Sequence, residues 1–136
     1  MSAPARNLYF PPTATTPEVS LALATQQLSL RGESYPENPA SFYGPLLVNL
    51  EQYFSQGDTT PFTLTIDLSY FNSSSTKALF RLLALCEKAA RAGRTIHVQW
   101  HYDLEDDGLH EFISDIHADF PVLNVTAVAL CHAERI

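Results

Sequence analysis

The stretch "DLSYFNSSSTKALFRLL", residues 67–83, runs from the end of a predicted strand into a predicted helix. Before the hydroxyl run the side chains alternate, and the apolar ones expected on one side of the strand are Phe62, Leu64, Ile66, Leu68 and Tyr70. This alternation is typical of a strand with one buried face. After the run, apolar residues recur at helical spacing, at Leu79, Leu82, Leu83, Cys86 and Ala90. Such a spacing predicts an amphipathic helix, and Gly93 is a suitable stop for it.

Further strands and helices are predicted before and after this strand–helix pair. The predicted order is β-β-α-β-α-β-α-β, with a hairpin at 19–32, a helix within 41–57, a strand at 94–102, a helix at 107–120 and a strand at 121–130. Pro45 indicates a late start or a distorted first turn of the first helix. The two central strands alternate rather than being apolar throughout, so we expect helices mainly on one face of the sheet. The predicted fold is α/β, with a single mixed sheet of about five strands.

The domain organisation follows from composition. Residues 1–17 hold four of the nine prolines and are expected to form an extended N-terminal arm. Residues 18–130 are expected to form one α/β domain, which is within the usual size range. Residues 131–136 are expected to be a C-terminal tail.

Composition and charge narrow the functional class. The 136 residues are 46% hydrophobic and 17% charged, and the net charge is −7. This balance argues against nucleic acid or an anionic membrane as the main partner, because both require clustered Lys and Arg. The two cysteines lack metal-site spacing and are interpreted as reduced thiols of a cytoplasmic protein. The first ten residues lack the apolar segment of a signal peptide.

The hydroxyl run Ser73, Ser74, Ser75 and Thr76 is the first candidate for chemistry. It lies where a parallel strand meets a helix N-terminus, and such a position favours an anion. Asn72 or Ser73 could serve as the N-cap. On spacing alone, plain capping by a turn of small residues is favoured over a phosphorylation site. A serine hydrolase is disfavoured, because no G-x-S-x-G elbow surrounds the run.

Residues of the same helix that fall off its apolar stripe are candidates for partner contact. They include Lys77, Phe80 and Arg81. Phe80 could equally pack against a neighbouring helix. Tyr70 and Asn72, together with Ser74 and Ser75, complete the predicted partner-binding set around the junction.

The segment "HYDLEDDG", residues 101–108, is a weaker candidate. Its carboxylates could bind Mg²⁺ or Ca²⁺, but their spacing is not that of an EF-hand. A solvated loop that caps the next helix is the favoured interpretation. His110 and His117 share a helical face, and surface histidines are the favoured interpretation there also. No metal, no cofactor and no catalytic set of residues is therefore expected.

Four segments together resemble the SiaC-type family of regulatory phosphoproteins, formerly a domain of unknown function. They are "TPEV" at 16–19, "GESYPEN" at 32–38, "DLSYFNSSSTK" at 67–77 and "WHYDLEDDG" at 100–108. The family is in turn similar to STAS-type anti-sigma factor antagonists, in which a Ser at a strand-to-helix junction is phosphorylated. The resemblance implies a STAS-like fold and a switch protein without catalysis of its own.

The resemblance also implies partners and a phosphoacceptor. The expected partners are a Ser/Thr kinase with a histidine-kinase-like ATPase fold, a PP2C-type phosphatase and a diguanylate cyclase that the unphosphorylated form activates. The expected output is cyclic-di-GMP signalling and biofilm or aggregate formation. The phosphoacceptor matches Ser73, directly after Asn72, with Ser74 as the runner-up because the family's usual Thr is replaced by Ser.

Two alternatives remain open at this point. One is a constitutive adaptor of the same fold, in which the hydroxyl run only caps the helix. The other is a small metal-dependent enzyme that uses the acidic loop at 103–107.

Overall fold

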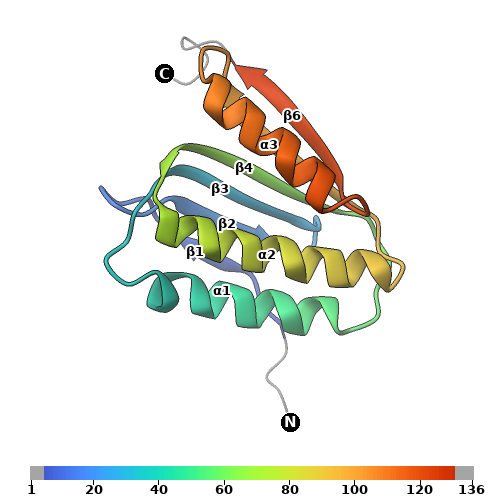
Figure 1. Cartoon of the computed structure of the whole chain (residues 1–136). Coiled ribbons are helices and arrows are strands. Elements are labelled where there is room, and N and C mark those ends of the chain that lie inside the picture. Colours follow the sequence, from blue (N-terminus) through green and yellow to red (C-terminus); the bar gives the residue numbers. More distant parts are fainter. Residues whose placement is uncertain (1–4, 131–136) are drawn as a thin grey trace.

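The computed structural model describes residues 5–130. Figure 1 shows a twisted sheet with helices packed against it. In chain order the elements are β1 (Leu8–Phe10), β2 (Glu18–Ala22), β3 (Gln27–Ser34), α1 (Pro39–Phe54), β4 (Phe62–Phe71), α2 (Ser73–Arg91), β5 (Ile96–Asp103), α3 (Asp107–Asp119) and β6 (Asn124–Leu130).

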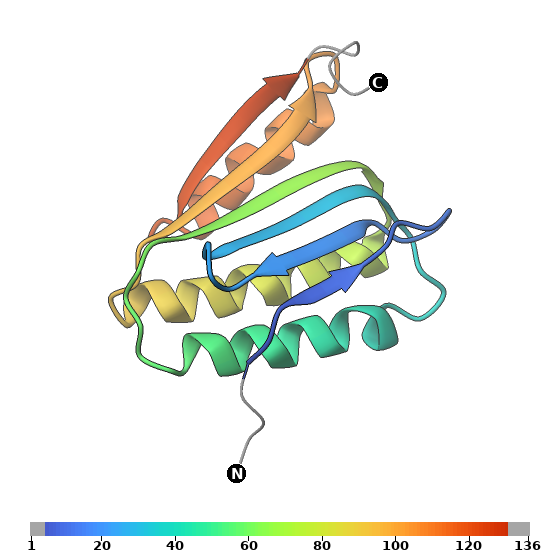
Figure 2. The same cartoon turned by 180° about the vertical axis from the view of Figure 1, so that it is seen from behind.

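The six strands lie in sequence order, β1-β2-β3-β4-β5-β6. The first two neighbouring pairs are antiparallel, and the remaining three are parallel. Successive β-α-β crossovers of one hand, taken in one direction across a sheet, place their helices on the same face. Figures 1 and 2 show α1, α2 and α3 on one side and an uncovered sheet on the other. The predicted mixed α/β sheet with helices on one face is therefore confirmed.

The predicted number of strands was too low, because residues 8–10 of the expected arm form β1. Leu8 lies opposite Leu21 in the antiparallel pair with β2. Asn49 of α1 accepts a hydrogen bond from the backbone N–H of Arg6 and donates one to its carbonyl oxygen. The proline-rich composition concealed a strand of three residues, which is too short for alternation to reveal. The predicted C-terminal tail, 131–136, lies outside the described residues.

Helix α1 begins earlier than Pro45 suggested. Asn38 is the N-cap and accepts a hydrogen bond from the N–H of Ser41, and Pro39 occupies the first turn. Pro45 is exposed and lies inside the helix, which continues through it with one backbone hydrogen bond fewer. The interpretation of a late start was therefore wrong, because the cap at Asn38 outweighs the lost hydrogen bond at Pro45.

A bulge in β4 changes which side chains point inward. Gly32 of β3 lies opposite Leu68, whereas the next residue, Glu33, lies opposite Tyr70, so that Ser69 is the extra residue. An extra residue in one strand reverses the alternation beyond it. Tyr70 is therefore 52% exposed, contrary to the predicted inward position, and Phe71 packs against the core instead.

The sheet divides between β4 and β5. These strands pair only from Phe62 opposite Ile96 to Ile66 opposite Trp100, and Figure 2 shows them diverging beyond that point. Aromatic side chains fill the wedge on the helical side. The ring centroids of Phe71, Trp100 and Phe112 lie 5.5–6.1 Å from one another. Trp100 is fully buried at this junction.

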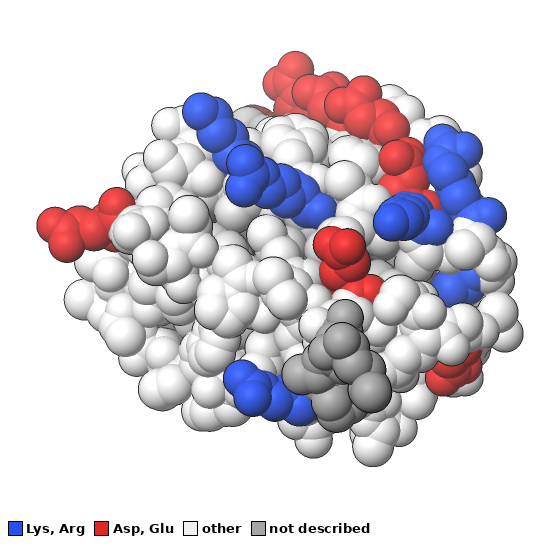
Figure 3. Space-filling view, turned by 90° about the horizontal axis from the view of Figure 1, so that it is seen from below, with Lys and Arg blue, Asp and Glu red and all other residues white. Residues whose placement is uncertain are grey.

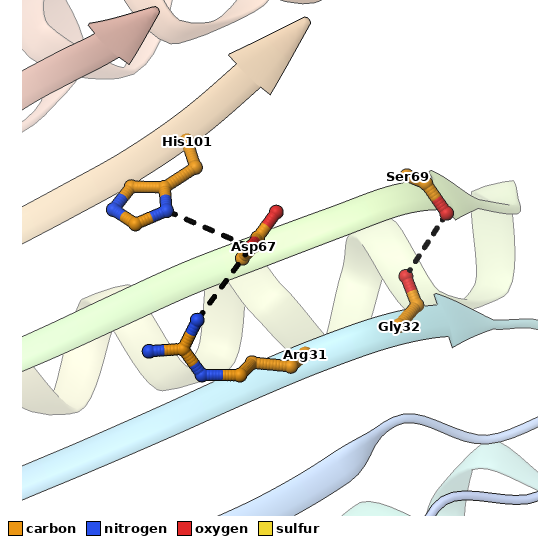
Figure 4. A network of polar contacts seen from close by, with 5 residues as sticks. All are labelled: Arg31, Gly32, Asp67, Ser69 and His101. Atoms are coloured by element: carbon orange, nitrogen blue, oxygen red, sulfur yellow. Dashed lines mark hydrogen bonds and ion pairs between the residues drawn. The ribbon is translucent and has the colours of Figure 1, made fainter. Parts of the chain in front are cut away.

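The uncovered face of the sheet is polar. Asp67 lies between Arg31 and His101, with nitrogen–oxygen distances of 3.6 Å to both (Figure 4). On the same strand, the Ser69 hydroxyl donates to the carbonyl oxygen of Gly32. Arg31, Asp67 and His101 come from β3, β4 and β5, so polar contacts tie the three strands together where β4 and β5 begin to diverge. Within residues 5–130, no helix is long and apolar enough to cross a membrane.

Candidate functional site

The junction between β4 and α2 places the hydroxyl run at the carboxyl edge of the parallel strands. Asn72 is the N-cap of α2, and its side-chain oxygen accepts a hydrogen bond of 2.9 Å from the N–H of Ser75. The backbone N–H of Asn72 donates to the carbonyl oxygen of Ser34, which anchors the junction to β3. The first turn of α2 carries no acidic side chain. The helix N-terminus therefore presents an uncompensated positive dipole end.

Two of the four hydroxyls in the run have structural roles. Ser75 is fully buried, and its hydroxyl lies 2.9 Å from the carbonyl oxygen of Ser34 and 2.8 Å from the hydroxyl of Ser34. The Ser34 hydroxyl in turn contacts the phenolic oxygen of Tyr43 in α1. The Thr76 hydroxyl donates to the carbonyl oxygen of Asn72 at 3.0 Å. Ser75 therefore connects the start of α2 to β3 and, through Ser34, to α1, whereas Thr76 stabilises the first turn of α2 itself.

Tyr43 contributes a neutral phenol to this network. Burial raises the pKa of Tyr43, and the hydrogen bonds with Ser34 and Ser75 partly oppose that effect. A raised pKa keeps the phenol protonated at neutral pH, because burial disfavours the charged form. The buried cluster therefore consists of three uncharged hydroxyls under the N-terminus of α2.

The other two hydroxyls are available to an external protein. Ser73 and Ser74 are exposed, and neither side chain makes a hydrogen bond with the described residues. They occupy the first two positions of α2, directly after the Asn72 cap. The run thus divides into two buried or bonded hydroxyls that hold the helix and two free hydroxyls at its exposed tip.

One residue of the predicted partner-binding set needs correction. Ser75 is fully buried and bonded to Ser34, so its side chain does not lie on the surface. Ser75 lies on the inner face of α2, four residues before the buried Leu79, and its hydroxyl donates to a buried carbonyl there. Asn72 is half-buried and acts as a cap, so its side chain is already engaged.

The remaining predicted residues surround the exposed tip. Lys77 and Arg81 are exposed on α2, and Tyr70 is exposed at the end of β4. Phe80 is 37% exposed and its ring lies 6.2 Å from Phe112 and 6.3 Å from that of Phe120, by centroid distance. Phe80 therefore packs on α3 and also presents part of its ring to solvent.

Sequence reasoning missed Tyr35. Its ring is 36% exposed and makes an edge contact with Tyr70, with centroids 5.7 Å apart. The two rings form an aromatic pair beside the carboxyl ends of β3 and β4. The sequence offers no clear signal for this residue, because a single exposed aromatic side chain in a loop is normal.

The acidic loop has helix-capping and turn roles. Asp106 is the N-cap of α3 and accepts from the N–H of Leu109, and Asp103 accepts from the N–H of Glu105. No three His, Cys, Asp or Glu side chains within residues 5–130 converge on a point that could hold a metal ion. The geometry therefore gives the metal-dependent alternative no support.

Charge on the helical side is divided into small groups. Figure 3 shows separate groups of Lys and Arg and a row of acidic side chains along one edge. On α2, Arg91 pairs with Glu87, which reduces the free positive charge there. The site is therefore suited to a protein partner rather than to a polyanion, which requires a broad basic surface.

Comparison with known proteins identifies close structural relatives. A family model described as SiaC family regulatory phosphoprotein matches residues 10–130. An uncharacterized protein of Pseudomonas aeruginosa (strain UCBPP-PA14) is 33% identical over 113 residues, which cover 83% of this chain and 89% of the relative.

Two solved structures share the whole fold. A crystal structure of the diguanylate cyclase SiaD in complex with its activator SiaC, from Pseudomonas aeruginosa, matches with a TM-score of 0.85 and 30% identity over 90% of this chain and 99% of that chain. The crystal structure of apo-SiaC from Pseudomonas aeruginosa matches with a TM-score of 0.80 and 28% identity over 93% and 99% of the two chains.

Proposed function

The chain belongs to the SiaC family of regulatory phosphoproteins, and from this premise we propose that it is a phosphorylation-controlled protein–protein switch. In this proposal the unphosphorylated form binds and activates a diguanylate cyclase, as the solved relative SiaC binds SiaD as its activator. The chain acts by binding and carries out no catalysis of its own.

The observation that carries the proposal is the pair of free hydroxyls at the tip of α2. Ser73 and Ser74 are exposed and unbonded to the described residues, whereas Ser75 and Thr76 are engaged in the fold. A kinase can reach the first pair without unfolding the helix. Ser73 is the proposed phosphoacceptor, and Ser74 is the runner-up.

Phosphorylation would act on binding rather than on folding. A phosphate adds nearly two negative charges and three acceptor oxygens at a helix N-terminus, where the dipole tolerates an anion. In an interface shaped for a neutral hydroxyl, the same dianion loses hydration that the helix dipole and a neighbouring cation replace only in part. A loss of about 3 kcal/mol lowers affinity by more than a hundredfold.

The proposed enzymes of the switch are a Ser/Thr kinase with a histidine-kinase-like ATPase fold and a PP2C-type phosphatase. The proposed setting is the cytoplasm, and the proposed output is cyclic-di-GMP signalling that governs biofilm formation or aggregation. These assignments rest on family membership together with the accessible hydroxyls of the first turn of α2.

Mass spectrometry of the protein purified from its own host tests the modification. We expect a phosphorylated species whose fragment ions place the group on Ser73. Phosphate on Ser74 would keep the mechanism and move the acceptor by one residue. The absence of any phosphorylated species under all growth conditions would favour a constitutive adaptor.

Binding measurements test the switch itself. Each full-length diguanylate cyclase of the host is titrated with the wild type, with Ser73→Ala and with Ser73→Glu. We expect Ser73→Ala to bind like the wild type and Ser73→Glu to bind weakly. Ser74→Ala and Ser74→Glu test the runner-up acceptor in the same way. Equal binding by the Ala and Glu variants at both positions would contradict the switch and leave a constitutive adaptor.

A further inference from the structure

Helices α1 and α2 lie side by side along their length (Figure 1). One hollow of about 400 Å³ lies between their N-terminal halves, lined by Tyr43 and Leu47 of α1 and by Ser74, Lys77 and Arg81 of α2. A second hollow of about 560 Å³ follows between their C-terminal halves. We call the two hollows together the α1–α2 groove.

The groove has apolar walls. Leu47 lines the first hollow, and Val48 and Leu85 line the second. Val48 is 60% exposed, although it is a large apolar side chain on a regular helix. Gly44 also faces the first hollow, and a Cβ added there would meet no atom within 4 Å. The groove therefore offers apolar surface and room for side chains from another molecule.

A strip of cations borders the groove on the α2 side. Lys77, Arg81 and Lys88 line the two hollows, and they are related as i, i+4 and i+11. At 3.6 residues per turn these positions lie within about 40° of one another around the helix and extend over about 16 Å. None of the three makes an ion pair with the described residues.

The cation strip contrasts with the charge of the whole chain. The net charge is −7, yet no Asp or Glu lines the first hollow, and the second is lined by a single carboxylate, that of Glu51. Exposed cations beside apolar surface, with Glu51 as the one carboxylate in the lining of the two hollows, complement a partner that carries carboxylates next to apolar side chains.

We propose that the α1–α2 groove binds an acidic, elongated segment of the partner diguanylate cyclase. The segment places apolar side chains in the two hollows and carboxylates against Lys77, Arg81 and Lys88. This inference rests on the proposed switch function and gives the chemistry of the surface that the partner presents.

The groove also connects recognition to the proposed phosphorylation. Ser74 lines the first hollow, and Ser73 lies four residues before Lys77 on the same helix. Side chains at i and i+4 are neighbours on a helix surface. A phosphate on either Ser would compete with the partner's carboxylates for Lys77 and would repel them.

Charge-neutralising variants test the groove. Lys77→Gln, Arg81→Gln and Lys88→Gln are compared with Arg91→Gln, which lies on the same helix, outside both hollows, and pairs with Glu87. The probe is each full-length diguanylate cyclase of the host, titrated by calorimetry at two salt concentrations. Each groove variant should weaken binding roughly two- to five-fold, as for exposed charge pairs. The triple variant should bind with a reduced dependence on salt, whereas Arg91→Gln should bind like the wild type.

A combined variant tests the competition for Lys77. If the added charge at position 73 acts through Lys77, Ser73→Glu combined with Lys77→Gln should weaken binding by less than the product of the single effects. A fully multiplicative result would overturn this link.

The outcomes separate the two proposals. If all three groove variants bind the cyclase with the affinity of the wild type, the groove inference is overturned and the switch stays intact. Failure of every host cyclase to bind the wild type would overturn the switch and the inference that rests on it. A wild-type dimer in sedimentation that the triple variant turns into a monomer would also overturn the inference, because it would assign the groove to a second copy.

Discussion

At the scale of single residues, the hydroxyl run serves two purposes: two of its hydroxyls bond to carbonyl groups at the junction, and two stay free at the surface. Asn72 already caps α2, so a serine was not needed for capping. Ser75 and Thr76 instead satisfy carbonyl groups at the junction, and Ser73 and Ser74 remain free. The free hydroxyls are therefore held at fixed positions by their bonded neighbours. Rigid presentation of this kind favours recognition by both a kinase and a binding partner.

Ser75→Ala should destabilise the protein by about 1–2 kcal/mol. The substitution removes one of the two donors to the buried carbonyl of Ser34, whose other donor is the N–H of Asn72, and breaks the contact with the Ser34 hydroxyl that continues to Tyr43. Two buried hydrogen bonds are lost, and each contributes about 0.5–1.5 kcal/mol. The free energy of unfolding from urea titration is the measurement. Ser74→Ala is the matched control and should change it by less than about 0.5 kcal/mol, as for other surface substitutions.

Ser73→Glu should leave the fold intact or stabilise it. The first turn of α2 has no acidic side chain, so the new carboxylate meets the positive end of the helix dipole. Such a charge contributes about 0.3–1 kcal/mol. Thermal unfolding at low salt should show an unchanged or higher midpoint. A clear fall in the midpoint would mean that a negative charge at this position weakens binding by disturbing α2 rather than by blocking the interface.

At the scale of secondary-structure elements, β4 shows what the sequence could and could not predict. Alternation placed residues 62–68 correctly, because a half-buried strand imposes a period of two. It failed at Tyr70, because the bulge at Ser69 depends on the register with β3. Gly32, opposite Leu68, has a φ of +122°, which a residue with a side chain rarely adopts. The predicted hairpin ends at Gly32, so this glycine is expected to end the strand, whereas in the structure it marks the bulge.

The candidate site was likewise predicted in part: its location was predicted, but the separate roles of its serines were not. The sequence located the hydroxyl run between strand and helix, and the first turn of α2 lies there. It did not separate Ser75 from Ser74, because the partner of Ser75 is Ser34, which is 41 residues away along the chain. The α1–α2 groove was also beyond prediction, because it is formed by two helices whose relative placement depends on the whole sheet.

Helix α2 also determines how its cysteine reacts. Cys86 is fully buried on the inner face of the helix, and this burial raises the pKa of the thiol to about 12. Only the thiolate is nucleophilic, so Cys86 should resist alkylation by iodoacetamide at pH 8 in the native protein and react in urea. Mass spectrometry of a Cys131→Ser variant makes Cys86 the single reporter. Rapid native labelling would contradict the burial of this helix face.

The same raised pKa has a consequence for stability. The pKa of the Cys86 thiol is about 12 in the folded protein and has the ordinary value of 9.0 in the unfolded chain. Its contribution to the free energy of unfolding is therefore fully present below pH 9. That contribution is lost as the pH rises from 9 towards 12, because only the unfolded chain then releases its proton. Alkaline unfolding should therefore be accompanied by exposure of a reactive thiol.

At the scale of the whole molecule, the backbone pairing between β4 and β5 covers only part of the two strands. β4 and β5 share five paired positions, and beyond them α3, β5 and β6 lean away from the rest (Figure 2). Beyond the paired positions, side chains carry the connection. The aromatic wedge of Phe71, Trp100 and Phe112 lies between the two parts, with Phe80 and Phe120 at its outer end.

The wedge should therefore be the most sensitive point of the connection. Phe112→Ala removes the ring that contacts Phe71, Phe80 and Trp100. For a large ring in such a position, the free energy of unfolding should fall by about 2–4 kcal/mol. Trp100 is the single tryptophan, so its near-ultraviolet circular dichroism should weaken in the native state as its ring loses a fixed neighbour. Leu104→Ala, at a side chain that is 60% exposed near the same end of the sheet, is the control and should change neither measurement. An unchanged Trp100 signal and unchanged stability in Phe112→Ala would mean that the backbone pairing of β4 with β5 alone holds the two parts together.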